Sequence, residues 1–302
     1  MKTIQKTIPE DKSRRSFIKQ SALAGALLAI HPYDLLAKRG QVASSHLTAA
    51  PAHRYTPVAI VWDAANLMIK DADIAWKMKD SISEQFNKMV AGQVLDRGLP
   101  YISEILTIIQ GGSGWSEEIH PQVALVAGWL VYRETAKVMN AQDTSPDQIL
   151  RQDVAVLKHT IGKSSSASPS AADVEDILKL LYHRATFRTH TLTPDTENWN
   201  EWVINYMDWY REDRQRMQSL ARAWVSGEEA STDFFNPNDE LIKIASDYSV
   251  SQIRLNESFV EGKGSSAYTQ ALAQSALALK SLDEFFKGNM SKSAFMQKHE
   301  IA

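Results

Sequence analysis

Apolar residues recur every three or four positions along most of the chain after Thr56. Because an α-helix turns once every 3.6 residues, this spacing predicts helices. The alternating Val, Ile and Thr runs typical of strands are missing from the sequence. We therefore predict an all-α fold, an irregular multi-helix bundle of about nine helices. The expected ranges are 57–70, 72–93, 99–110, 118–141, 146–160, 171–189, 194–226, 237–261 and 266–287, followed by a short helix at 291–299.

Several of these helices have a recognisable start. In Ser145-Pro146-Asp147-Gln148 a hydroxyl residue precedes a proline at the first helical position, and Gln148 is placed to close a capping box. Asn236-Pro237-Asn238-Asp239 repeats the arrangement with asparagine as the expected cap. In both segments the side-chain oxygen would accept from a backbone N–H that the first helical turn leaves unpaired.

Two segments have the composition of tightly packed helices. Residues 123–131 are apolar almost all round and include Gly128, so we expect a central buried helix there. This is the longest apolar run after the N-terminal region, and it is too short to span a bilayer. The segment 271–282 has alanine at 271, 273, 276 and 278 and leucine at 272, 277, 279 and 282, which permits a close helix–helix approach.

The longest loop-like stretch divides the chain. Residues 162–169 are rich in serine and end in Pro169, which is typical of a connector. We expect a helical domain at 53–302, either one bundle or two halves, 55–162 and 170–302, joined by this Ser-rich loop. Residues 1–52 form a separate N-terminal segment, which we expect to be a leader followed by a flexible connector.

Composition narrows the function classes. The 302 residues include no cysteine, so disulfides, thiolate metal sites and cysteine nucleophiles are excluded. The net charge of −3 is uneven, because residues 1–52 carry eight basic and three acidic side chains. The remaining 25 basic and 33 acidic residues give residues 53–302 a charge of −8. A body this acidic does not favour nucleic acid or an anionic membrane surface as a partner.

The N-terminus resembles a twin-arginine (Tat) export signal. Arg14 and Arg15 are followed by Phe17 and Lys19, and an apolar Ala- and Gly-rich stretch follows at 20–30. The resemblance covers the N-terminal leader alone and implies that the Tat translocation machinery is a partner and that the location is periplasmic or secreted. The apolar stretch is about half the length of a membrane span. A protein tethered to the membrane by an uncleaved leader is the alternative.

Two cleavage points fit the leader. Ala50-Pro51-Ala52 would leave His53 as the first residue, and Ala43-Ser44-Ser45 would leave His46. Because the Tat route carries folded proteins, the resemblance favours a bound cofactor or a co-exported partner. It identifies neither.

Two candidate ligand-binding features lie in the second half. The first is a compact basic cluster that suits a carboxylate or phosphate ligand, formed by His183, Arg184, Arg188 and His190. The alternative is that these cations complement the dipole at a helix C-terminus. The expected helix at 194–226 carries aromatic rings on one face, beginning with Trp199 and Trp202. We expect that face to be core, the alternative being a groove in which the rings stack on a ligand.

The histidines suggest little metal chemistry. Glu117 and His120 have the Glu-x-x-His spacing of carboxylate-bridged metal sites, but the sequence has no second copy, and Pro121 places His120 at a helix start. His159 and His299 are isolated in the sequence and are expected to face solvent. The motifs of phosphate loops, dinucleotide-binding folds, zinc proteases and serine-nucleophile elbows are missing.

Three functions fit these observations. The first is a periplasmic binding or accessory protein with a groove for an anionic or apolar ligand or a partner, lined by the helix at 194–226, the helix at 118–141 and the basic cluster. The second is a helical metal- or cofactor-dependent enzyme that uses Glu117, His120 and His183. The third is a structural subunit co-exported with a redox partner. The sequence neither identifies a cofactor nor decides whether the protein is an enzyme.

Overall fold

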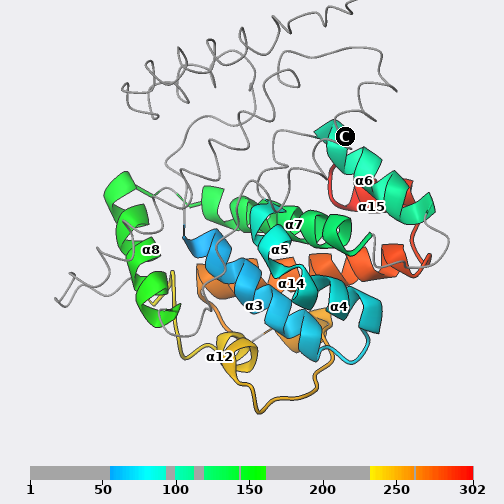
Figure 1. The fold of residues 1–302 in the computed structure, drawn as a ribbon. Coiled ribbons are helices and arrows are strands. Elements are labelled where there is room, and N and C mark those ends of the chain that lie inside the picture. Colours follow the sequence, from blue (N-terminus) through cyan, green and yellow to red (C-terminus); the bar gives the residue numbers. More distant parts are fainter. Residues whose placement is uncertain are drawn as a thin grey trace, which may run out of the picture. The chain divides into compact units, whose positions relative to one another are not determined.

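The computed structural model describes residues 55–92, 99–111, 119–142, 144–160, 232–261 and 263–301 (Figure 1). These residues form helices without a strand, so the all-α prediction is confirmed for them. All of them belong to one compact unit, Ala52–Ala302. The helices are α3 (Thr56–Lys70), α4 (Trp76–Glu84), α5 (Phe86–Ala91), α6 (Leu99–Gly111), α7 (His120–Asn140), α8 (Pro146–Thr160), α12 (Glu240–Ser246), α13 (Glu257–Val260), α14 (Ala267–Phe286) and α15 (Lys292–Lys298).

Helix α7 is the centre of the core. Every residue from Val123 to Val131 is buried, as the apolar pattern predicts. Helices α14, α5, α3, α4 and α6 all pack against it, and Figure 1 shows α14 running alongside α7 with α3 next to both. Residues before and after the Ser-rich loop therefore share one hydrophobic core. Whether the chain also forms two halves stays a prediction, because the loop lies outside the described residues.

Glycine sets the distance between α5 and α7. A Cβ built on Gly128 would overlap the carbonyl group of Met89, and one built on Gly92 would overlap the backbone of Gly128 and Trp129. Only a residue without a side chain fits at either point. Helix α14 also approaches α7 closely, because its small residues allow the Ser275 hydroxyl to come within 3.5 Å of the Val131 carbonyl oxygen. The predicted close approach of this Ala-rich helix is confirmed.

The start of α8 is the capping box predicted from the sequence. The backbone N–H of Ser145 donates to the Gln148 side-chain oxygen at 2.9 Å, and the N–H of Gln148 donates to the Ser145 hydroxyl at 3.4 Å. Helix α3 begins differently, since its N-cap residue Tyr55 makes no side-chain cap bond. Asp153 of α8 takes that role across the fold.

The expected helix at 72–93 is wrong in its extent. Asp71 is extended and forms a parallel bridge with Ile253, and α4 begins only at Trp76. The intervening turn is held from α14, because Lys280 donates to Asp73 at 3.2 Å and Asp283 accepts from the N–H of Ala75 at 3.3 Å. A break at Gln85 (φ −112°, ψ 30°) then separates α4 from α5.

The expected helix at 237–261 is also wrong, because only α12 and the short α13 are helical there. Between them Ile253 pairs with the end of α3: its N–H donates to the Lys70 carbonyl, and its own carbonyl accepts from Ala72. Asn236 does not cap a helix. Its side chain accepts from the N–H of Asn238 in an Asx turn, and α12 starts four residues after Asn236, at Glu240.

The C-terminal end of α15 is closed by a Schellman motif. The N–H of Ile301 donates to the Met296 carbonyl, and the N–H of Glu300 donates to the Gln297 carbonyl. Glu300 therefore has a φ of 53°, in the left-handed region where glycine is usual. Ile301 is buried, which fixes the end of the chain against the core.

Within the described residues, none of the helices is both long enough and apolar enough to cross a membrane.

Candidate functional site

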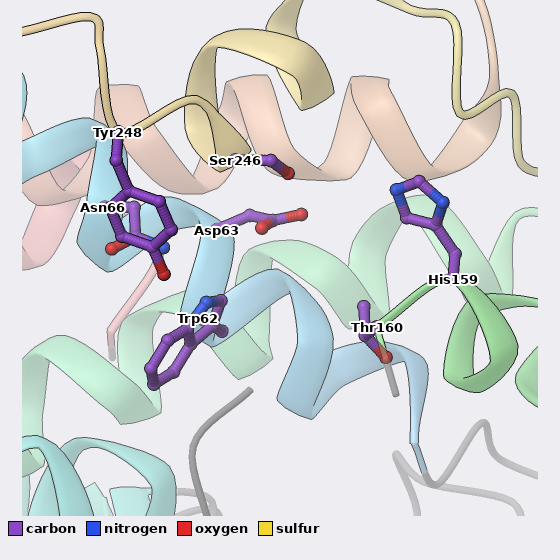
Figure 2. Close-up of a pocket in the computed structure, with 7 residues that line it drawn as sticks. All are labelled: Trp62, Asp63, Asn66, His159, Thr160, Ser246 and Tyr248. Atoms are coloured by element: carbon purple, nitrogen blue, oxygen red, sulfur yellow. The ribbon is translucent and has the colours of Figure 1, made fainter. Parts of the chain in front are cut away.

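A recess lies where α3, α8 and the end of α12 meet (Figure 2). Helix α3 contributes residues from two successive turns, α8 contributes its last two residues, and the segment from the end of α12 contributes two more. The lining residues are Trp62, Asp63, Asn66, His159, Thr160, Ser246 and Tyr248. Figure 2 shows Trp62 and Tyr248 on one side of the recess and His159 on the other, with the carboxylate of Asp63 between them.

The α8 wall is fixed by buried polar contacts to the start of α3. Asp153 accepts from the N–H of Tyr55 at 3.2 Å, from the N–H of Thr56 at 3.0 Å and from the Thr56 hydroxyl at 2.6 Å. At the last residue of α8, the Thr160 hydroxyl lies 2.7 Å from the Tyr55 hydroxyl. These contacts place the end of α8, with His159 and Thr160, beside the first turns of α3.

The α12 wall is fixed by Lys70 at the end of α3. Its ammonium group donates to the carbonyl oxygens of Ile244, Ala245 and Asp247, at or just beyond the last turn of α12. A cation at this end of a helix satisfies carbonyl groups that the last turn leaves unpaired. Burial lowers the pKa of Lys70, although the charges of Asp247 and Asp63 act in the opposite direction. This contact places Ser246 and Tyr248 beside the second and third turns of α3.

The floor of the recess is acidic. Asp63 is 5% exposed, and its Oδ2 atom accepts from the Tyr268 hydroxyl at 2.7 Å. Burial, followed by the charge of Asp63 and this hydrogen bond, raises the pKa of Tyr268 well above its usual value. Tyr268 therefore stays protonated and acts as a donor. The recess combines this carboxylate with the hydroxyl, amide and imidazole groups of its other lining residues.

The recess is small. Its cavity volume is about 20 Å³. This is enough for one or two waters or for one small polar group. An organic cofactor or a sugar ring needs several hundred cubic ångströms and does not fit inside.

Three of the exposed large apolar side chains lie on segments that the bridge between Asp71 and Ile253 joins. Among the described residues, the large apolar side chains that stand exposed are Ile69, Trp76, Tyr248 and Leu150. Ile69 lies seven residues after Trp62 on the same face of α3. Trp76 is 67% exposed and begins α4, five residues after Asp71. Asp71 forms the bridge to Ile253, and Tyr248, which is 78% exposed, lies five residues before Ile253. We call Ile69, Trp76 and Tyr248 the exposed apolar set; Leu150 is on α8.

A second polar cluster joins α7, α14 and α15. His299 is 4% exposed, so the prediction that it faces solvent is wrong. Its Nε2 atom lies 3.1 Å from the Ser281 hydroxyl and its Nδ1 atom 3.5 Å from Glu134 Oε1. A serine, a histidine and a carboxylate lie in sequence as in a hydrolase triad. Ser281, however, is buried near the end of α14, so a substrate carbonyl cannot reach its oxygen in this arrangement. The cluster therefore anchors α15.

Glu134 is the charged member of this anchor. Burial raises its pKa, but hydrogen bonds from His299 and Lys137, with the charge of Lys137, outweigh burial and hold the pKa below its usual value. Lys137 lies 3.2 Å from Glu134, and Arg133 donates to the Glu300 carbonyl at 2.6 Å. The end of the chain is therefore held to α7 by charged groups as well as by Ile301.

Of the residues predicted to bind metal, His120 alone is described. It begins α7, is buried, and its Nδ1 atom lies 3.4 Å from Glu84 of α4. No group of three or more His, Asp or Glu side chains is placed to hold a metal ion in the described ranges. Glu117 lies outside them. So do the leader residues Arg14, Arg15, Phe17 and Lys19, and the ligand-binding candidates His183, Arg184, Arg188, His190, Trp199 and Trp202.

The sequence analysis did not identify the residues of the recess. A local signal existed, because Trp62, Asn66 and Ile69 follow helical spacing with both polar and apolar members on one face of α3. Their partners at 159–160 and 246–248 are about ninety or more residues away, and no sequence pattern connects them. His159, expected to face solvent, is half-buried and packs edge-on against Phe235 at 5.3 Å.

Comparison with known proteins identifies no relative: no family model, no curated protein and no solved structure matches this chain.

Proposed function

We propose that this protein is an exported helical accessory protein that binds a protein partner at the end of α3. The leader supports export through its resemblance to a Tat signal, with Arg14 and Arg15 followed by Phe17 and Lys19. The observation that carries the binding function is the exposed apolar set of Ile69, Trp76 and Tyr248. Single exposed apolar side chains are common. These three lie on segments joined by the bridge between Asp71 and Ile253, and the proposal is that they act together as one interaction site.

The composition of this surface favours a protein as the partner. Tryptophan and tyrosine are enriched at protein–protein interfaces, because their large rings lose little conformational entropy on binding. Lys77, whose ammonium lies 5.5 Å from the centre of the Trp76 ring, gives the same surface a polar margin. The segments that carry these residues are fixed to one another by the bridge between Asp71 and Ile253 and by the contacts of Lys70 to α12. The surface therefore needs little ordering to bind.

Site-specific cross-linking in the native host tests this function. A photoreactive phenylalanine analogue replaces Tyr248 in the full chain, and the matched control carries it in place of Leu150 on α8. We expect one product of constant mass from position 248, containing this chain and a second exported protein, and a weaker product when Ile69→Ser is added. Absence of a product, or the same products from position 150, contradicts the proposal.

The identified pair is then measured with purified proteins. Trp76→Ser is expected to weaken the affinity by roughly tenfold or more, as the loss of an interface tryptophan usually does. Leu150→Ser should leave the affinity unchanged. A Trp76→Ser variant that binds as well as the unmodified protein would show that the exposed apolar set is not the interface.

The export step has its own test. Arg14→Lys and Arg15→Lys together should leave the chain unprocessed in the cytoplasm. If the double variant reaches the periplasm normally, the Tat assignment is wrong.

A helical enzyme that carries a metal or cofactor is the second candidate, favoured by a leader of the kind that carries folded proteins. Native mass spectrometry with elemental analysis of the exported protein separates the two. A stoichiometric metal or added organic mass would support the enzyme, and Glu117, His120 and His183 would be the first residues to replace.

A further inference from the structure

We infer that residues 251–255, which we call the edge segment, act as an open β-strand edge to which the partner adds an extended segment of its own chain. This inference rests on the proposed function for the source of that chain, and it adds the form in which the partner is recognised. Three features lead to it: the pairing of Ile253, the unpaired backbone on either side of Ile253, and the alternation of buried and exposed side chains.

The edge segment pairs with the end of α3 through one residue. The N–H of Ile253 donates to the Lys70 carbonyl at 3.0 Å, and the Ile253 carbonyl accepts from the N–H of Ala72 at 2.8 Å. These two hydrogen bonds form the parallel bridge between Asp71 and Ile253. Residues 250–256 contain no helix and no turn, and in Figure 1 they belong to the stretch of chain that follows α12. The edge segment is therefore strand-like, with one side on the end of α3.

The other side of the edge segment has unpaired backbone groups. In a strand, the N–H and carbonyl groups of neighbouring residues point to opposite sides, so those of Gln252 and Arg254 point away from the end of α3. Both residues are exposed, and within the described part of the chain no group donates to or accepts from their backbone. Two N–H and two carbonyl groups therefore stand along one side, as on a strand that lacks a neighbour.

The edge segment is held in place before any partner binds. Leu255 is buried, and its carbonyl accepts from the ammonium group of Lys280 on α14. Asn256 caps α13, because its side chain accepts from the N–H of Phe259 at 2.7 Å. A segment fixed in this way loses little conformational freedom on binding, so hydrogen bonds to an added strand are not offset by a large ordering cost.

The side chains of the edge segment alternate between the surface and the core. Gln252 is exposed and the Arg254 side chain is 78% exposed, whereas Ile253 is half-buried and Leu255 is buried. An added strand continues both faces, with one set of its side chains beside Ile253 and the other beside Gln252 and Arg254. The partner segment should therefore alternate apolar and polar residues.

A helix of the partner would suit this place less well. A helix uses its backbone N–H and carbonyl groups internally, so it would leave those of Gln252 and Arg254 unpaired. An extended segment pairs with them, and its backbone supplies affinity while its side chains supply specificity. The exposed apolar set adds side-chain contacts, because Tyr248 lies four residues before Gln252 and Ile69 lies two residues before Asp71.

A short peptide tests the edge segment without the partner. The probe is acetyl-Lys-Val-Thr-Val-Thr-Val-Lys-amide, which alternates apolar and polar residues. The matched control has the same sequence with a methyl group on every backbone nitrogen of its Val and Thr residues, so that neither of its edges can donate. Backbone hydrogen exchange of the full chain, resolved to single residues by mass spectrometry, measures where each peptide pairs.

We expect the N–H groups of Gln252 and Arg254 to exchange fast in the free protein and that of Ile253 to exchange slowly, because only the last is hydrogen-bonded. The probe at millimolar concentration should slow exchange at Gln252 and Arg254 saturably, and the methylated control should not. Slow exchange at Gln252 and Arg254 without peptide would overturn the inference. So would equal effects of the two peptides, or no effect of the probe.

A pair of variants separates the backbone from the side chain. Arg254→Pro removes the N–H that faces away from α3, whereas Arg254→Ala removes the side chain and keeps this N–H. We expect Arg254→Pro to weaken the probe about fivefold or more, as the loss of one hydrogen bond does, and Arg254→Ala to have little effect. A larger effect of Arg254→Ala would overturn the inference. If circular dichroism shows that Arg254→Pro does not fold, Gln252→Pro and Gln252→Ala take their place.

The edge segment and the proposed function fail separately. A cross-linked partner that binds Arg254→Pro and Arg254→Ala with the same affinity disproves the strand pairing and leaves the accessory function in place. Protection of Gln252 and Arg254 by the probe, without any cross-linked partner, supports the open edge and contradicts the accessory function.

Discussion

Replacement of Asp153 by alanine tests how α3 is started. Asp153 is 2% exposed and accepts three hydrogen bonds, from the N–H groups of Tyr55 and Thr56 and from the Thr56 hydroxyl. Since the N-cap residue Tyr55 offers no side-chain cap bond, Asp153 of α8 satisfies the first turn of α3 from 97 positions along the chain. The start of the helix therefore depends on the docking of α8.

The expected loss of stability follows from these three contacts. Loss of a helix cap costs about 1 kcal/mol. Each of the two other buried donors left without an acceptor costs about 1 kcal/mol more. The sum of about 3 kcal/mol corresponds to a decrease in Tm of about 6–12 °C for a folded unit of this size. Asp153→Asn keeps one acceptor oxygen and should lose less.

Thermal unfolding followed by circular dichroism measures the effect. Asp233→Ala is the matched control, because Asp233 is exposed and such surface changes shift stability by about 0.5 kcal/mol or less. In a Thr56→Val background, Asp153→Ala should cost about 1 kcal/mol less, since one of its donors is already gone. If Asp153→Ala lowers Tm no more than Asp233→Ala does, the cap from α8 does not stabilise α3 and the argument is refuted.

Three further predictions use the same unfolding measurement. Gly128→Ala should lower Tm by about 6 °C or more, because its Cβ would overlap a backbone carbonyl of α5. Gly288→Ala should cost only about 1 kcal/mol, since Gly288 has a φ of 79° and open space around it. Equal shifts would contradict the close contact. Glu300→Gly should raise stability by up to about 1 kcal/mol, because glycine adopts the left-handed φ of 53° without strain, and a lower Tm would show that the side chain matters more than the backbone. Glu134 has a lowered pKa, so its contribution to stability is present above its usual pKa of 4.5 and is lost as the pH falls through the lowered pKa. The unmodified protein should therefore lose its stability advantage over Glu134→Gln on acidification. A stability advantage that is independent of pH would contradict this.

Helix positions were predicted well where packing and local pattern agree. Helices α3, α6, α7, α8, α14 and α15 begin and end within about two residues of the expected ranges, because each carries a full apolar stripe and several have a recognisable cap. The expected helices at 72–93 and 237–261 failed at the same place in the fold. Asp71, just before the first range, and Ile253, inside the second, form a parallel bridge, a contact between residues 182 positions apart that no local pattern reports.

The candidate site was harder to predict than the fold. The sequence drew attention to histidines that have acidic or basic residues nearby in the chain. Whether a histidine is buried depends on tertiary packing, which its position along the chain does not determine. His299, which looked isolated, is enclosed by Ser281 and Glu134, while Asp63 and Tyr248 stood in segments without any motif. The basic cluster and Trp-rich helix of the second half stay predictions, because they lie outside the described residues.

The sequence by itself determined what depends on neighbours within one or two helical turns. It was sufficient for the all-α class, for the buried helix at 123–131 and for the capping box at Ser145 and Gln148, because these follow from 3.6-residue periodicity and from hydrogen bonds over three positions. The tertiary structure alone decided that Asp153 caps α3, that His299 is buried, and that Asp63, His159 and Tyr248 line one recess. Each of these brings together residues that are far apart in the chain, and their contacts form only when the packing of the core has fixed the helices against one another.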